Sequence, residues 1–127
     1  MDNGERDNHA QNMARAAELN ERQARIRELN DTFRASMFGG RWVITSGVKS
    51  LGSSAVGDIV AAVRSFNSFD YANDRYHEHD FGCIEWGGSR IFFKIDCYDK
   101  NLEFGSLDPT DRGVTTRVIT IMLASEY

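Results

Sequence analysis

The sequence predicts an α+β domain, with an antiparallel sheet of about three to five strands and helices packed on one face. Residues 13–37 and 54–66 have apolar side chains at helical spacing, whereas residues 81–98 alternate apolar and polar positions around a Gly-Gly pair. The chain has 127 residues, of which 41% are hydrophobic, so we expect one ordered domain at 13–127. Residues 1–12 are polar and without periodicity, which predicts a flexible tail.

The helix expected at 13–37 has a narrow apolar stripe and ends at Gly39-Gly40. In its first half the stripe is mostly alanine, so we expect this half to project into solvent or to pack against another protein. A homodimer is one such arrangement. The stripe residues follow one another at intervals of seven, three, four and four positions: Leu19, Ile26, Leu29, Phe33 and Met37.

A strand and a second helix are expected next. The segment RWVITSGV, residues 41–48, is rich in β-branched side chains and predicts a strand. The polar stretch NSFDYANDRYHEHD, residues 67–80, predicts a loop. Between them, the helix at 54–66 carries a continuous apolar face formed by Val56, Ile59, Val60, Val63 and Phe66.

A β-hairpin is expected at residues 81–98, with Gly87-Gly88 as its two-residue turn. In this register Glu85 lies opposite Arg90 as a cross-strand ion pair. Cys83 and Cys97 fall on opposite faces, so we expect both to be free thiols. The face that holds Cys97 also collects apolar side chains for the core: Ile84, Trp86, Ile91, Phe93 and Ile95.

The last segment, residues 114–127, combines two conflicting signals. Its high content of β-branched residues favours a strand. An Asp-rich turn precedes it, however, and Val114, Val118, Ile121 and Ser125 recur at helical spacing. We predict a helix here, the third on the same face of the sheet.

The polar face of the hairpin carries the main candidate site. The expected register places His79 opposite Asp96, with Lys94 on the same face. We favour a structural His79–Asp96 pair that holds the loop against the sheet. Two alternatives stay open: a divalent metal bound by His77, His79 and Asp96, and acid–base chemistry by His79, Asp80 and Asp96.

Charge and targeting signals limit the function classes. The 15 Lys and Arg residues face 19 Asp and Glu residues, and the resulting net charge of -4 argues against binding of duplex nucleic acid. No apolar run is long enough for a membrane span, and the N-terminal residues lack a signal-peptide pattern, so we expect a cytoplasmic protein. Without a cofactor-binding motif, no cofactor is expected.

Six blocks of the chain, in order, resemble a small proteobacterial family that is known as a domain of unknown function and is common on plasmids, phages and other mobile elements. The blocks lie within residues 25–127, and they are RIRELNDTFR, GGRWVITSGV, NDRYHEHDFG, KIDCYD, FGSLDPTDR and TTRVITIMLASEY. The resemblance implies a bacterial protein but brings no established activity.

In that family the loop motif is similar to N-D-P-x-G-E-H-D-F-G and the strand motif to K-I-D-Y-Y-D. This chain differs at Arg75, His77, Cys97 and Leu107, where the family has Pro, Gly, Tyr and Pro. Since His77 is one of the departures, a metal site that includes it would belong to this chain and not to the whole family. The motifs imply these binding residues: Asp74, Glu78, His79, Asp80, Lys94, Asp96, Tyr98 and Asp99.

Two function classes remain. We favour a non-catalytic protein-binding factor of a mobile element, such as an anti-restriction or anti-CRISPR inhibitor that docks on a host nuclease or CRISPR complex. A small acidic domain suits this role because its surface can occupy a groove that normally holds nucleic acid. The alternative is a small hydrolase, metal-assisted or of the His–Asp type, that uses His79, Asp80 and Asp96.

Overall fold

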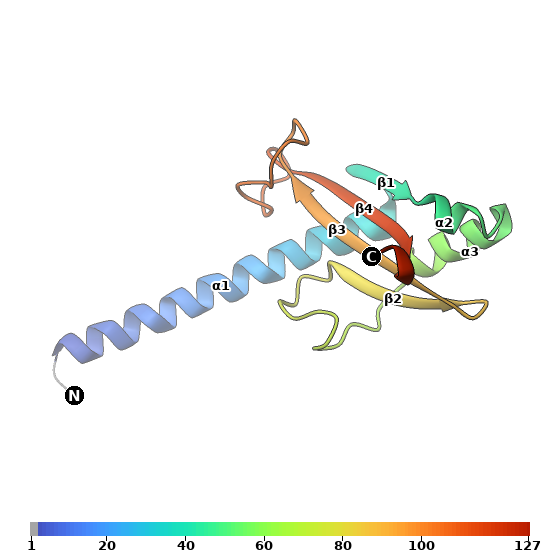
Figure 1. Ribbon diagram of the computed structural model, residues 1–127. Helices are drawn as coiled ribbons and strands as arrows, with labels where there is room; N and C mark the ends of the chain where they lie inside the picture. Colours follow the sequence, from blue (N-terminus) through green and yellow to red (C-terminus); the bar gives the residue numbers. More distant parts are fainter. Residues whose placement is uncertain (1–2) are drawn as a thin grey trace.

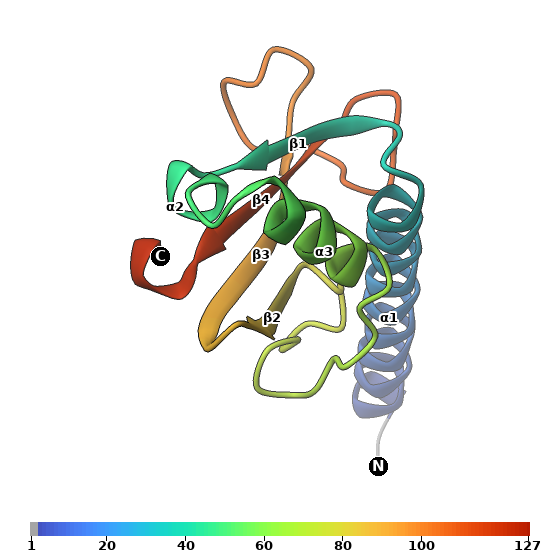
Figure 2. The same ribbon diagram turned by 90° about the vertical axis from the view of Figure 1, so that its right-hand side faces the viewer.

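In the computed structural model, which describes residues 3–127, α1 and α3 cover one face of a four-stranded sheet (Figures 1 and 2). The helices are α1 (Asn3–Ser36), α2 (Ser46–Lys49) and α3 (Ser53–Arg64). The strands are β1 (Gly40–Ile44), β2 (Phe81–Trp86), β3 (Ser89–Tyr98) and β4 (Thr116–Leu123), and a 3-10 turn follows at Ala124–Glu126. The predicted α+β class is confirmed.

The sheet is mixed, with the strand order β1-β4-β3-β2. β2 pairs with β3 and β3 pairs with β4 in antiparallel fashion, but β1 and β4 run parallel. The prediction of a wholly antiparallel sheet was therefore wrong. Parallel pairing arises because the chain leaves β1 through α2, α3 and the β2–β3 hairpin before β4 enters beside β1.

The C-terminal segment is a strand and not the predicted helix. β4 lies between β1 and β3, so it is hydrogen-bonded along both edges. Ile119 and Ile121 are fully buried on the inner face, and Val118 and Thr120 alternate with them on the half-buried outer face. Residues 116–123 therefore form a strand, as their β-branched side chains favour, because β1 and β3 pair with them on both edges.

The hairpin register is confirmed. Glu85 lies opposite Arg90, and Phe81 lies opposite Lys94. Gly87 and Gly88 have φ values of 55° and 81°, the left-handed conformation that a tight two-residue turn requires. The expected apolar face also points to the core.

The core lies between the inner face of the sheet and the two long helices (Figure 2). Phe33 enters it from α1, and Ile59 and Val63 enter it from α3. Ile91 and Phe93 of β3 are fully buried beneath them. Phe93 lies edge-on to Phe66, with 5.2 Å between the ring centroids, which ties the loop after α3 to the sheet.

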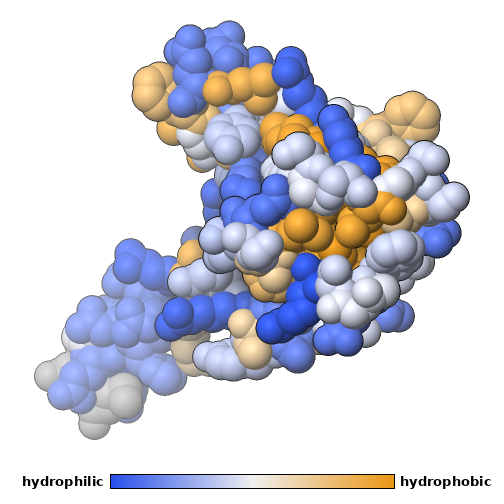
Figure 3. Space-filling model, turned by 45° about the vertical axis from the view of Figure 1, so that its right-hand side comes forward, coloured by the Kyte–Doolittle hydropathy of each residue, from blue (hydrophilic) through white to orange (hydrophobic). Residues whose placement is uncertain are grey.

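Helix α1 is longer than expected, because it begins at Asn3 and not near residue 13. The predicted tail at 1–12 is thus helical from Asn3 onward, and residues 1–2 lie outside the described part of the chain. Ile26, Leu29 and Phe33 are buried, but Leu19 is 54% exposed and all of residues 4–22 are exposed. This part of α1 projects from the domain and is largely hydrophilic (Figures 1 and 3). Among residues 3–127, no helix combines the length and the apolar character of a membrane span.

The two cysteines are free, as the hairpin register predicted, and both are half-buried. Burial raises the pKa of the Cys97 thiol, which lowers its fraction of reactive thiolate. We expect Cys97 to react with iodoacetamide at pH 8 much more slowly in the folded protein than in urea. Peptide mass spectrometry should find two labelled thiols after unfolding; an equal labelling rate at Cys97 in both states would disprove its protection.

Candidate functional site

His79 lies in the loop before β2, and its ring is held between two carboxylates. Nδ1 lies 2.8 and 3.0 Å from the two carboxylate oxygens of Asp31 on α1, and Nε2 lies 3.4 Å from Oδ2 of Asp74. The ring also stacks on Phe69, with 3.8 Å between the centroids. His79 therefore links the loop to α1.

The predicted pairing of His79 with Asp96 was wrong. The β2–β3 ladder begins at Phe81, and His79 and His77 have φ values of 55° and 57°, so the chain turns away before it could pair with the end of β3. Asp96 instead forms an ion pair with Lys94, with 3.0 Å between Oδ2 of the aspartate and Nζ of the lysine. This hydrogen bond from Lys94 to Asp96 raises the pKa of the lysine.

Three further polar contacts fix the loop that carries the site. Asp74, which is 3% exposed, accepts a hydrogen bond of 2.9 Å from the His79 amide. Asn30 of α1 donates to the carbonyl of Glu78 at 2.9 Å, and Arg27 donates to the carbonyl of His77 at 3.0 Å. Asp74 is thus a structural residue.

Glu78, Asp80 and Asp96 line one pocket of about 230 Å³, called here the carboxylate pocket. Burial raises the pKa of Glu78, and the Asp80 carboxylate raises it further. Burial also raises the pKa of Asp80, and so do the charges of Asp74 and Asp96, against a hydrogen bond from its own backbone. The remaining lining residues bring no cation: Ile26, Asn30, Ile95, Cys97 and Pro109.

A second pocket of about 410 Å³ adjoins the first, because Asp80, Ile95 and Asp96 line both. Its walls carry two exposed aromatic side chains, Tyr76 (59% exposed) and Tyr127 (76% exposed). We call this second space the aromatic pocket. Tyrosine side chains are enriched in protein–protein interfaces.

The sequence-predicted site residues therefore divide into three groups. Asp80, Lys94 and Asp96 meet in the aromatic pocket, and Glu78 joins Asp80 and Asp96 in the carboxylate pocket. His79 and Asp74 anchor the loop, as described above. The last two lie elsewhere: Tyr98 pairs with Thr116 in the sheet, and Asp99 accepts hydrogen bonds from the amides of Asn101 and Glu103 in the following turn.

The candidate metal ligands His77, His79 and Asp96 do not converge. His77 is exposed, and His79 faces Asp31 and Asp74. Within residues 3–127, no group of three or more histidines, cysteines, aspartates and glutamates is placed to hold a metal ion.

A family model described as "Protein of unknown function (DUF3768)" matches residues 44–126. The chain belongs to this family. The DUF3768 match covers the three carboxylates of the carboxylate pocket, Glu78, Asp80 and Asp96. It also covers every residue of the aromatic pocket except Tyr127. Helix α1, which carries Asn30 and Asp31, precedes the matched region. No curated protein and no solved structure gives a significant match.

Sequence reasoning missed the residues of α1 that hold the loop. Arg27, Asn30 and Asp31 belong to the helix predicted at 13–37, but they lie outside its apolar stripe. The only available signal was their position beside the buried residues Ile26 and Leu29, on the flank of the apolar stripe.

Proposed function

We propose that this protein is a non-catalytic binding factor that docks on another protein by taking an arginine or lysine side chain of that partner into the carboxylate pocket. One observation carries the proposal. Asp80 and Glu78 are partly buried carboxylates with raised pKa values, and within residues 3–127 neither has a cation at ion-pair distance. Three carboxylates line the pocket and no cation does, and the more distant charges of Arg22 and Arg117 offset the negative charge at Glu78 only in part, so the pocket favours a positive ligand.

The dimensions of the pocket favour one side chain over a free small molecule. Sites for small molecules usually enclose about 300–1,000 Å³, and the carboxylate pocket encloses about 230 Å³. A guanidinium group can bond carboxylates with two parallel N–H donors, which gives directional recognition. The adjoining Tyr76 and Tyr127 provide apolar contact area around such an anchor.

Arg75 makes a cation–π contact with Tyr76 in the aromatic pocket. Its Cζ atom lies 5.9 Å from the centre of the Tyr76 ring, a distance typical of cation–π contact. A guanidinium from outside can use the same ring face after Arg75 moves aside, because Arg75 is exposed. The aromatic pocket thus accepts the stem of a basic side chain whose head reaches Asp80.

The charge of the pocket supports one class of partner. Lysine and arginine line the grooves in which nucleases hold nucleic acid. We propose that the protein is a factor of a mobile element and acts on a host nuclease or CRISPR complex in the bacterial cytoplasm. Its net charge of -4 accelerates encounter with such a basic surface.

The alternative, a small hydrolase, has less support. Both ring nitrogens of His79 face structural carboxylates, so a hydrolytic site would depend on Asp80 and Asp96 alone. Asp96 is in turn bound to Lys94. Binding of a cationic side chain, in contrast to hydrolysis, requires only the negative charge of the carboxylate pocket.

Co-purification with the Asp80→Asn variant tests the proposal. Tagged protein expressed in the native cell should retain a partner that Asp80→Asn loses and that Asp58→Asn, an exposed carboxylate on α3, keeps. Substituting arginines in the groove of the captured partner should also abolish the complex. A complex that survives Asp80→Asn, or one that contains no arginine or lysine at the pocket in chemical cross-linking, would contradict the proposal.

The stability of Asp80→Asn provides the folding control. A carboxyl group with a raised pKa binds more protons in the folded state, so its ionisation lowers stability as the pH rises through the folded-state pKa. We expect the melting temperature of Asp80→Asn at pH 7 to equal or exceed that of the original protein. Loss of binding then reports on the pocket and not on unfolding.

A further inference from the structure

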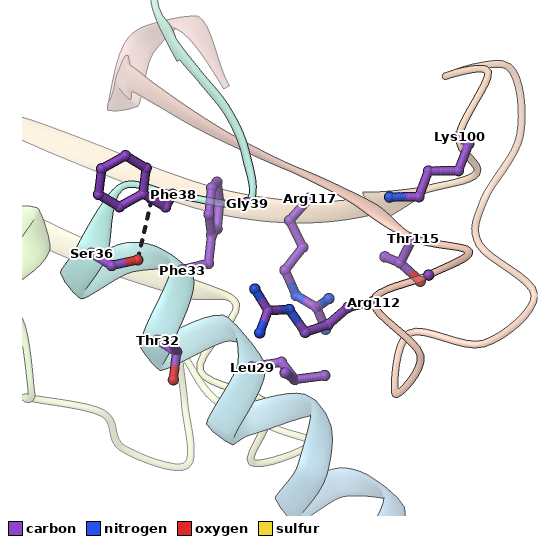
Figure 4. Close-up of a pocket in the computed structure, with 11 residues that line it drawn as sticks. Leu29, Thr32, Phe33, Ser36, Phe38, Gly39, Lys100, Arg112, Thr115 and Arg117 are labelled. Carbon is purple, nitrogen blue, oxygen red and sulfur yellow. Dashed lines mark hydrogen bonds between the residues drawn. The ribbon is translucent and has the colours of Figure 1, made fainter.

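A third pocket, of opposite charge, lies between the C-terminal end of α1 and the loop that joins β3 to β4 (Figure 4). It encloses about 420 Å³, within the usual range for small-molecule sites. We call it the cationic pocket. Its charged lining residues are Lys100, Arg112 and Arg117, and the others are Leu29, Thr32, Phe33, Ser36, Phe38, Gly39, Gly113 and Thr115.

Arg117 of β4 is the buried part of this pocket. The residue is 3% exposed, yet its two hydrogen-bond acceptors are neutral. Nε donates to Oδ1 of Asn30 at 2.7 Å, and Nη2 donates to the carbonyl of Pro109 at 2.6 Å. Within residues 3–127, no carboxylate forms an ion pair with Arg117. The negative charge of Glu78 acts on Arg117 from beyond ion-pair distance and raises its pKa, but burial outweighs this effect, so an anion bound directly to the guanidinium would stabilise it.

Two further cations point into the same space. In Figure 4 the side chains of Arg112, Arg117 and Lys100 extend into the pocket, and the charge of Arg112 acts on Arg117. Burial lowers the pKa of Arg117, and the neighbouring charge of Arg112 adds to this effect. Like charges gathered at one pocket repel one another until an anion is bound.

The lining contains no carboxylate that could supply that anion. The cationic pocket instead offers uncharged donors, the hydroxyl groups of Thr32 and Ser36, and an apolar wall that includes Phe38, which is 81% exposed. Such a combination suits an oxyanion that is attached to an organic group.

We propose that the cationic pocket binds the phosphate group of a small organic phosphate. Two guanidinium groups can each bond a phosphate with paired donors, and the ammonium of Lys100 adds a third positive charge. A long nucleic acid is disfavoured, because the chain as a whole carries a net charge of -4 and the cations lie in a concave pocket and not along a stripe. The cationic pocket shares no lining residue with the carboxylate pocket, although Arg117 bonds Asn30 and Pro109 of that pocket, and the phosphate proposal does not depend on the proposed docking function.

Calorimetry and thermal shift assays on the full chain test this site, in a low-salt buffer without phosphate. The probes are inorganic phosphate, adenosine 5′-monophosphate and adenosine. We expect phosphate and the nucleotide to bind and to raise the melting temperature, and adenosine to have no effect. Equal effects of adenosine and its monophosphate, or no binding of either anion at millimolar concentration, would overturn the proposal.

Charge-neutralising variants locate the binding. Arg112→Gln should weaken binding of the nucleotide by about tenfold or more, since hydrogen bonds to charged groups are among the strong ones. Lys100→Gln should weaken it less, whereas the controls Arg90→Gln and Lys49→Gln, exposed cations outside the pocket, should change it less than about twofold. Arg117 is left intact because its removal risks unfolding.

Two competitor ligands decide the chemical class. Citrate, a polycarboxylate, should bind less tightly than the nucleotide, and so should a single-stranded oligonucleotide when compared per site. Tighter binding of citrate would overturn the phosphate assignment, and tighter binding of the oligonucleotide would overturn the assignment to a small molecule. Equal affinity of Arg112→Gln and the original protein would show that the ligand binds elsewhere.

Discussion

Replacing Phe93 by alanine is expected to lower the free energy of unfolding by ~3–5 kcal/mol, the range for large aromatic truncations in a core. Phe93 is fully buried on β3, and its ring packs edge-on against Phe66 and Phe69. Alanine would leave a cavity between the sheet and the loop that follows α3. Urea denaturation measures the change directly.

Phe104 provides the matched control for this substitution. It is the same residue type but is 71% exposed in the loop after β3, so Phe104→Ala should change stability by less than about 0.5 kcal/mol. If Phe93→Ala cost less than about 1 kcal/mol, the inner and outer faces of the sheet would be assigned the wrong way round.

Replacing His79 by alanine is expected to lower the free energy of unfolding by ~1–3 kcal/mol, because the buried carboxylate of Asp74 loses a partner. The substitution also removes the contact with Asp31 and the stacking on Phe69. His77→Ala, at an exposed position two residues earlier, serves as the control and should have little effect. A thermal or urea melt of both variants makes the comparison.

Double-mutant cycles identify the partner of His79. The effects of His79→Ala and Asp31→Asn should be non-additive by at least about 0.5 kcal/mol, since the two side chains are in contact. The effects of His79→Ala and Asp96→Asn should add. Coupling of His79 to Asp96 and none to Asp31 would restore the pairing that the strand register predicted and refute the loop geometry described above.

The hairpin could be predicted from sequence because its determinants are local. A Gly-Gly pair fixes the turn, and the apolar alternation on either side fixes the register, since a slip of one residue would expose Ile91 and Phe93. The helix predicted at 54–66, which corresponds to α3, was equally clear, because its apolar face falls within one short segment.

Other parts of the fold depend on contacts between distant segments. β4 is a strand because β1 and β3 pair with it on both edges, and nothing within residues 114–127 announces those neighbours. Asp31, the partner of His79 on α1, likewise lies 48 positions away in the sequence. Local periodicity cannot identify such partners.

The candidate site was predicted in part. Asp80, Lys94 and Asp96 do meet, because Lys94 and Asp96 are two positions apart on one strand face and Asp80 precedes the paired strand. The two exposed tyrosines of the aromatic pocket were not predicted as site residues. Tyr76 lies in the predicted loop at 67–80, and Tyr127 lies in the segment that was predicted as a helix. Their common feature was exposure, which only the structure shows.

The most direct test of the docking proposal is an NMR titration of the ¹⁵N-labelled protein with N-acetyl-arginine amide, a model of the partner's side chain. We predict millimolar binding that shifts the amide signals of Glu78, Asp80, Asp96 and Cys97, persists in Asp58→Asn and disappears in Asp80→Asn. N-acetyl-glutamine amide, which has no charge, should cause no shifts. Shifts that are absent from the carboxylate pocket, or that are unchanged in Asp80→Asn, would contradict the account.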